Sequence, residues 1–121
     1  MNTSWWVKYR IVNGAATITT ADRHVLVDCT SGDAELTLPV SASCQDPGSG
    51  AWWWCKFVRI GTYNSNHMVF IGQDGDVVSA FDQTAADTQP VNAAFSDCIA
   101  RAGTGGHYLE SPTPTATGGL A

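Results

Sequence analysis

The chain has 121 residues, of which 44% are hydrophobic and only 14% are charged, and its formal net charge is −5. A chain of this size is expected to form one domain around a single core, and its hydrophobic share excludes wholesale disorder. The acidic balance argues against a nucleic-acid or anionic-membrane partner, because both bind through basic surfaces. No segment approaches the ~20 apolar residues of a membrane span.

The N-terminal segment, residues 1–15, is rich in aromatic side chains. It lacks the charged start and long apolar run of a signal peptide, so we expect the protein to be made and folded in a cytoplasm. Trp5–Val12 is a candidate strand, and Asn13-Gly14 is a turn signal that predicts a hairpin with residues 16–19. Aromatic side chains combined with basic ones suit an arm that docks onto an acidic partner surface. The candidate docking residues are Trp5, Trp6, Lys8, Tyr9 and Arg10.

Residues 16–40 carry the clearest strand pattern of the chain. Val25–Val27 is a compact apolar run that ends at Asp28, and a polar turn follows. Alternation of apolar and polar residues over 35–38 then predicts a strand with one buried face. Pro39 cannot donate to a sheet, so it closes that strand or lies on an edge.

The rest of the chain continues in short strands separated by glycine-containing loops. Ser41–Gly50 is expected to be a loop, and no amphipathic helix of ten residues is found. Many short strands at roughly 8–12-residue spacing predict an all-β fold, a small β-sandwich or a barrel-like (β-tulip or jelly-roll-like) domain over residues 16–110. Residues 111–121, SPTPTATGGLA, are expected to be a flexible tail. The further expected strands are Trp52–Ile60, Met68–Ile71, Val77-Val78, and a last hairpin of Cys98–Arg101 with His107–Leu109.

The four cysteines form no C-x-x-C pair, so a zinc site has little support. Without a secretory signal we expect reduced thiols that act as small buried hydrophobes, with one or two disulfides as the alternative.

No motif predicts catalysis, a metal or a cofactor. Asp74-Gly75-Asp76 lacks the further ligands of a calcium loop and reads as a β-turn. Gly48-Ser49-Gly50 is not a nucleophile elbow, and Gly103–Gly106 is followed by a strand rather than by a phosphate-binding helix. The three histidines have no metal-binding spacing and are expected in surface or turn positions: His24, His67 and His107. We therefore expect no enzyme.

The order of these elements resembles a β module common in tailed-phage virion proteins. That module runs from a "VLVD" strand and a Ser-Gly turn to a strand ending in Leu-Pro. It continues through basic-aliphatic and apolar strands to a Gly-Thr-Gly turn with an aromatic residue. The three tryptophans at 52–54 and the four cysteines depart from it. The matching segments are Asp22, Val25–Asp28, Ser31-Gly32, Leu36–Pro39, Lys56–Ile60, Val69–Ile71 and Gly103–Tyr108.

The resemblance implies a homotrimeric virion structural protein, such as a capsid decoration (cement or head-fibre) protein that binds the major capsid protein or another virion protein. Trp52 and Trp54 should share one face of a strand and Trp53 the other, so one ring can fill the core while others meet a partner. We assign Trp52, Trp53 and Trp54 to a subunit interface. The alternative is a tail-fibre or receptor-binding module in which these rings stack on a host surface glycan.

Overall fold

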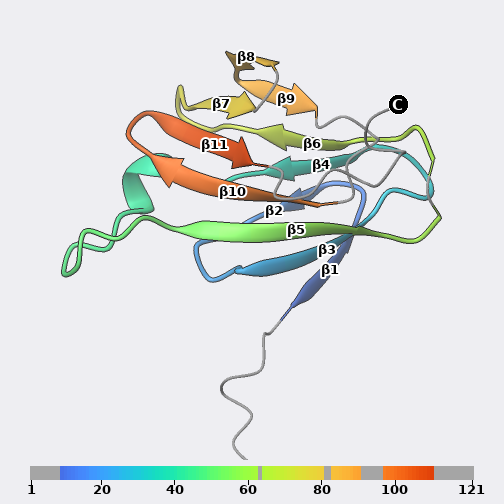
Figure 1. Cartoon of the computed structure of the whole chain (residues 1–121), viewed down its shortest axis with the longest axis horizontal. Coiled ribbons are helices and arrows are strands. Elements are labelled where there is room, and N and C mark those ends of the chain that lie inside the picture. The colour runs from blue at the N-terminus through green and yellow to red at the C-terminus, as the bar shows by residue number, and fades with distance from the viewer. Residues whose placement is uncertain (1–8, 63, 81–82, 91–96, 111–121) are drawn as a thin grey trace, which may run out of the picture.

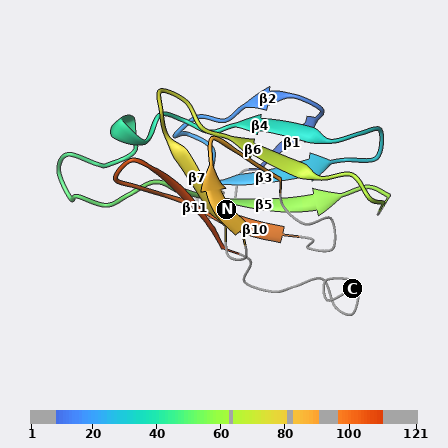
Figure 2. The ribbon, with the colours of Figure 1, turned by 90° about the horizontal axis from the view of Figure 1, so that it is seen from above.

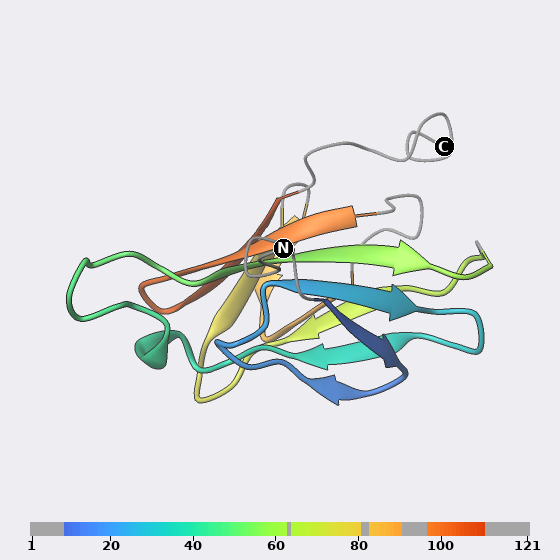
Figure 3. The same cartoon turned by 90° about the horizontal axis from the view of Figure 1, so that it is seen from below.

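The computed structural model describes residues 9–62, 64–80, 83–90 and 97–110, and these form an all-β structure of two mixed sheets. The larger sheet has the order β1-β3-β5-β10-β11-β7-β8 and the smaller one the order β2-β4-β6-β9. Figures 2 and 3 show the two layers face to face, as expected for a sandwich. The elements are β1 (Arg10–Asn13), β2 (Ala16–Thr17), β3 (His24–Asp28), β4 (Ala34–Thr37), η1 (Ser41–Ser43), β5 (Trp54–Ile60), β6 (Met68–Ile71), β7 (Val77–Ala80), β8 (Gln83–Ala86), β9 (Thr88–Pro90), β10 (Asp97–Gly103) and β11 (Gly106–Glu110).

The first six strands wind alternately through the two sheets (Figure 1). Strands β1, β3 and β5 pair in parallel in the larger sheet, and β2, β4 and β6 pair in parallel in the smaller one. The hairpin predicted at Asn13-Gly14 is therefore wrong. The turn instead carries the chain from one sheet to the other, because β1 pairs with β3 and β2 with β4. β1 is thus part of the sheet, and the folded body begins before residue 16.

The core lies between the sheets and follows the alternation read from the sequence. Val25 and Val27 of β3 point inward and are fully buried. Phe57 of β5 and Phe70 of β6 meet edge to face, with ring centroids 4.9 Å apart, and join the two layers. Edge-to-face packing of two buried rings adds to the free energy gained by burying their area.

The cysteines contribute to this core. Cys29, Cys44, Cys55 and Cys98 are all buried free thiols. Burial raises the pKa of the Cys55 thiol to about 12 and raises that of Cys98 as well. Such thiols stay protonated at neutral pH and behave as small hydrophobes.

Polar side chains join successive connections at one end of the sandwich, which we call the arch end. It comprises residues 29–33, between β3 and β4, and residues 61, 62 and 64–67, between β5 and β6. Asn64 Nδ2 donates to the carbonyl oxygens of Cys29 and Thr30, and the Thr62 amide donates to Thr30 Oγ1. Each connection therefore satisfies polar groups of the other, which holds the two connections together.

The C-terminal hairpin of β10 and β11 lies beside β5, and its turn confirms the prediction at Gly103–Gly106. No helix among the described residues has the length and apolar character needed to cross a membrane.

Candidate functional site

The outer face of the larger sheet carries three side chains in register across three adjacent strands. Trp54 of β5 is the register partner of Arg101 of β10, and Arg101 is the partner of Tyr108 of β11. Strands lie about 4.8 Å apart, so these side chains form a continuous row about 10 Å long. We call these three residues the Trp-Arg-Tyr row.

Large exposed apolar side chains gather on this same face. Among the described residues, they occupy outward positions on β1, β5, β7 and β11, and Tyr9 directly precedes β1. Such a concentration on one face is typical of an interaction surface. They are Tyr9 (61% exposed), Ile11 (61%), Trp54 (42%), Val77 (44%) and Tyr108 (46%).

The outer face of the smaller sheet differs. Its outward positions include Thr17, Thr37 and Thr88, and its aliphatic side chains Val69 and Ile71 are half-buried. None of the large exposed apolar side chains of the described residues lies there.

Basic side chains lie beside the row, and the acidic side chain of Glu110 lies there as well. The Arg23 guanidinium lies over the Trp54 ring, 5.6 Å from its centroid. Lys56 is two residues from Trp54 on the same side of β5, while Arg101 pairs with Glu110. Three of the six basic residues of the chain (Arg23, Lys56 and Arg101) thus lie around one tryptophan. Within the described part of the chain, the recorded ion pairs involve neither Arg23 nor Lys56.

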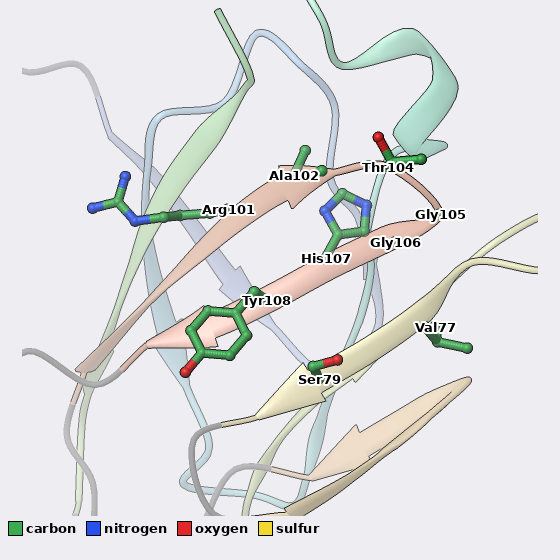
Figure 4. A pocket seen from close by; sticks show the side chains of 10 residues that line it. Val77, Ser79, Arg101, Ala102, Thr104, Gly105, Gly106, His107 and Tyr108 are labelled. Atoms are coloured by element: carbon green, nitrogen blue, oxygen red, sulfur yellow. The ribbon is translucent and has the colours of Figure 1, made fainter.

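A shallow pocket of about 230 Å³ lies beside the row, between β7 and the β10–β11 turn. In Figure 4, Tyr108 and Arg101 extend over the sheet surface, with Ser79 and Val77 on the neighbouring strand. The pocket is small, open and has both polar and apolar walls. It suits a protruding side chain of a partner better than an enclosed small molecule.

The three tryptophans at 52–54 divide as their alternation predicts, and this corrects one assignment. Trp53 is 3% exposed, donates from Nε1 to the Asp22 carbonyl oxygen and contacts His107 edge to face. Its ring is enclosed within the chain, so the assignment of Trp53 to a subunit interface is wrong. Trp52 is half-buried against the core, and Trp54 is the most exposed of the three.

The predicted N-terminal docking residues are only partly described. Tyr9 is exposed, as docking requires. Arg10 is used inside the chain: its Nη1 lies 3.0 Å from Asp22 Oδ2 and also donates to the Thr17 carbonyl oxygen. Arg10 as a docking residue stays a prediction, because its side chain is 41% exposed although it pairs with Asp22. Trp5, Trp6 and Lys8 lie outside the described residues.

A buried polar cluster lies behind the row and has the composition of a catalytic triad without its geometry. Asp76 accepts hydrogen bonds from the Ser41 amide (2.7 Å) and from Ser41 Oγ (2.6 Å). His107 Nε2 lies 2.7 Å from the Pro39 carbonyl oxygen and 4.0 Å from Asp76 Oδ2. The Ser41 proton is directed at the carboxylate and the imidazole proton at a backbone oxygen. The imidazole is therefore not hydrogen-bonded to the hydroxyl as the base of a catalytic triad is.

The same cluster corrects the surface or turn position expected for His107. Its side chain is buried, and burial lowers its pKa below 6.5 although the hydrogen bond to Pro39 opposes the shift. The neutral ring, with its proton on Nε2, is the form that fits the Pro39 contact. The hydrogen bond between Ser41 and Asp76 ties η1 to the residue before β7, and the Pro39 contact ties β11 to the residue that follows Leu38.

The sequence analysis did not identify Arg101 and Tyr108 as functional residues. The pattern of a strand does not show which residues of other strands lie beside it, so their position next to Trp54 could not be predicted. The only available signal was their outward alternation in the last hairpin, and pairing with β5 could not be read from it. Comparison of the chain with family models, curated proteins and solved structures finds no match.

Proposed function

We propose that the protein is a structural protein of a tailed-phage virion, most simply a capsid decoration (cement or head-fibre) protein. It docks through the outer face of its larger sheet onto an acidic surface of the assembled shell, such as the major capsid protein. The Trp-Arg-Tyr row is the observation that carries the docking surface. Its three residue types are those most enriched in the energetic centres of protein interfaces.

The surroundings of the row support this assignment. The exposed apolar side chains provide area toward the roughly 800 Å² per partner of a standard interface. Arg23 and Lys56 add positive charge that steers encounter with an acidic surface and fixes orientation. The virion assignment itself rests on the resemblance of residues 16–110 to the phage β module.

The mechanism is adhesive. A protein that binds only the assembled shell shifts the equilibrium toward that shell by mass action. We propose three copies per docking unit, as the resemblance implies, with the protein made in the host cytoplasm and incorporated into the virion. Sedimentation equilibrium of the purified protein tests the trimer, and a monomeric mass at micromolar concentration would remove it.

The docking experiment measures binding of purified variants to shells of the phage that encodes the chain. Trp54→Ala, Arg101→Ala and Tyr108→Ala should each weaken binding about 30-fold or more, as expected for residues at an interface centre. Val69→Ala and Ile71→Ala on the opposite sheet are the matched controls and should bind as the wild type. Equal losses on both faces, or no loss on the row, would contradict the proposed surface.

A receptor-binding module of a tail fibre is the second candidate function. A tryptophan-lined pocket beside residues 43–54 favours it, because such pockets suit host surface glycans. Saturable binding to host cells, with none to shells, would replace the decoration assignment by this one.

A further inference from the structure

Residues 44–53, between η1 and β5, form a loop that projects beyond the sheets at the end opposite the arch end (Figures 1 and 3). Its shape is fixed by its own backbone. The Asp46 amide donates to the Ala51 carbonyl oxygen and the Gly50 amide to that of Asp46, while Gln45 and Trp52 form a bridge. The loop is therefore folded before any ligand arrives, which reduces the entropy lost on binding.

Asp46 is held as an ionised acceptor within this loop. Its Oδ2 accepts from the Ser49 amide (2.9 Å) and from Ser49 Oγ (2.7 Å), and these bonds lower the pKa of the carboxyl group. A carboxylate has about four lone-pair sites, so acceptor capacity remains for a ligand. Gln45 donates one N–H to the Gly50 carbonyl oxygen and keeps its amide oxygen and second N–H.

The loop and the tryptophans line an open pocket of about 510 Å³, a volume within the usual range for small-molecule sites. Trp52 and Trp54 line it, and Gln45 and Asp46 contribute polar groups. Trp54 is 42% exposed and Trp52 half-buried, so aromatic surface meets polar groups in one concave site. Arg23 also lines the pocket, close to Trp54.

From this arrangement we infer that the pocket binds a neutral pyranose saccharide. The apolar face of the sugar ring stacks on exposed tryptophan surface, as aromatic rings favour apolar C–H groups. The ring hydroxyls donate to the Asp46 carboxylate, and the Gln45 amide both donates and accepts. Charged acceptors make hydrogen bonds roughly twice as strong as neutral ones, so Asp46 provides the main polar contact.

The chemistry of the lining favours a sugar over other ligands. Arg23 and Asp46 both line the pocket, so their opposite charges offset each other and the lining suits a ligand without net charge. A purely apolar ligand would displace water from Asp46 and Gln45 without replacing the hydrogen bonds that this water makes. A sugar ring has one apolar face that can contact the tryptophans and several hydroxyls that can hydrogen-bond to Gln45 and Asp46. The inference rests on the second candidate function, and the pocket shares Trp54 and Arg23 with the docking surface. Gln45 and Asp46 lie outside the Trp-Arg-Tyr row, so substitutions there test sugar binding separately from shell docking.

The test is a titration of the full chain with simple sugars, in which ligand-observed NMR measures binding. The probes are the methyl glycosides of glucose, galactose and N-acetylglucosamine, with glucuronic acid as the charged comparison. We expect saturable binding of at least one neutral glycoside with a Kd near the millimolar range. Asp46→Ala should abolish detectable binding, and Gln45→Ala should weaken it several-fold.

Ser49→Ala is the matched control, because it loosens the hold on Asp46 but keeps the carboxylate; it should retain most of the binding. Tyr108→Ala should bind the sugar normally while losing shell binding, so the two proposals fail separately. The inference is overturned if no neutral glycoside binds the wild type or if Asp46→Ala binds unchanged. Binding of glucuronic acid alone, lost on Arg23→Gln, would also overturn it.

Discussion

The two ends of the sandwich use their polar and aromatic residues differently. At the arch end, polar groups bond within the chain: the Thr62 amide donates to Thr30 Oγ1, and Asn64 Nδ2 donates to the Thr30 carbonyl oxygen. The opposite end, which we call the loop end, contains the projecting loop of residues 44–53 and the Gly103–Gly106 turn. Both pockets and the Trp-Arg-Tyr row belong to this end.

This difference separates residues that hold the fold from residues available to a partner. The polar groups that are hydrogen-bonded to each other at the arch end stabilise the fold and are not offered to a partner. Trp54 and Tyr108 at the loop end contribute exposed area that the fold itself does not need. Substitutions at the arch end should therefore change the free energy of unfolding, and those on the exposed loop-end surface should change binding.

At the arch end, the largest loss of stability is expected at Gly61. Its φ is +84°, and an added Cβ would lie 2.5 Å from Thr30 Oγ1 and 2.7 Å from Asp28 Oδ1. The backbone conformation alone costs roughly 1–2 kcal/mol for a non-glycine residue. With the steric conflict, Gly61→Ala should lower the free energy of unfolding by about 3 kcal/mol in urea denaturation.

Two other glycines separate these causes. Gly14 has the same φ of +84° but an added Cβ meets nothing within 4 Å, so Gly14→Ala should lose only the conformational part. Gly32 has no positive φ, and an added Cβ there meets nothing within 4 Å. The free energy of unfolding of Gly32→Ala should therefore stay within about 0.5 kcal/mol of the wild-type value. Equal losses at Gly61 and Gly14 would show that the packed arches do not constrain Gly61.

The second-largest of these losses of stability is expected at Asp76, a buried residue whose hydrogen bonds hold the fold together. Asp76→Ala leaves the buried Ser41 amide and hydroxyl without their acceptor, so it should cost about 2–3 kcal/mol of stability. Ser41→Ala removes only the hydroxyl bond and should cost less. A double-mutant cycle measures their coupling, and additive losses would contradict a direct interaction.

A smaller effect is expected from pH through His107. Its pKa in the folded chain is lower than the unfolded value of 6.5, so the unfolded chain binds more protons between these two values. The free energy of unfolding should therefore fall as pH decreases from about 7 to about 5. Urea denaturation across this range measures the slope. His107→Gln should flatten it, and an unchanged slope would assign the dependence to other groups.

The smallest effects on stability are expected on the loop-end surface. Trp54→Ala and Tyr108→Ala remove side chains that are nearly half exposed, so each should change the free energy of unfolding by about 1 kcal/mol or less. Thermal denaturation measures this directly. A loss as large as that of Gly61→Ala would mean that these rings support the fold rather than a partner.

Local alternation was enough to predict several strands. Val25–Val27 and Met68–Ile71 were found because apolar residues in short runs between turn signals favour strands. The Asp74-Gly75-Asp76 turn was also predicted, and Asp74 and Gly75 both have positive φ there. The partner of Asp76 was not, since Ser41 is 35 residues away.

Pairing between strands was beyond the local pattern. A turn signal such as Asn13-Gly14 does not distinguish a hairpin from a crossing between sheets, and the parallel winding was missed for that reason. Strand β8 was missed because Gln83–Ala86 has no apolar alternation. The Trp-Arg-Tyr row depends on the register of β5, β10 and β11, which only the folded chain defines.

The central claim, that the outer face of the larger sheet is the docking surface, is tested most directly by one pair of binding isotherms. Tyr108→Ala and Val69→Ala are titrated against purified shells under the same conditions. We predict a loss of about 30-fold or more for Tyr108→Ala and wild-type affinity for Val69→Ala. Wild-type affinity for Tyr108→Ala, with a loss for Val69→Ala, would place the docking surface on the opposite sheet and contradict the account.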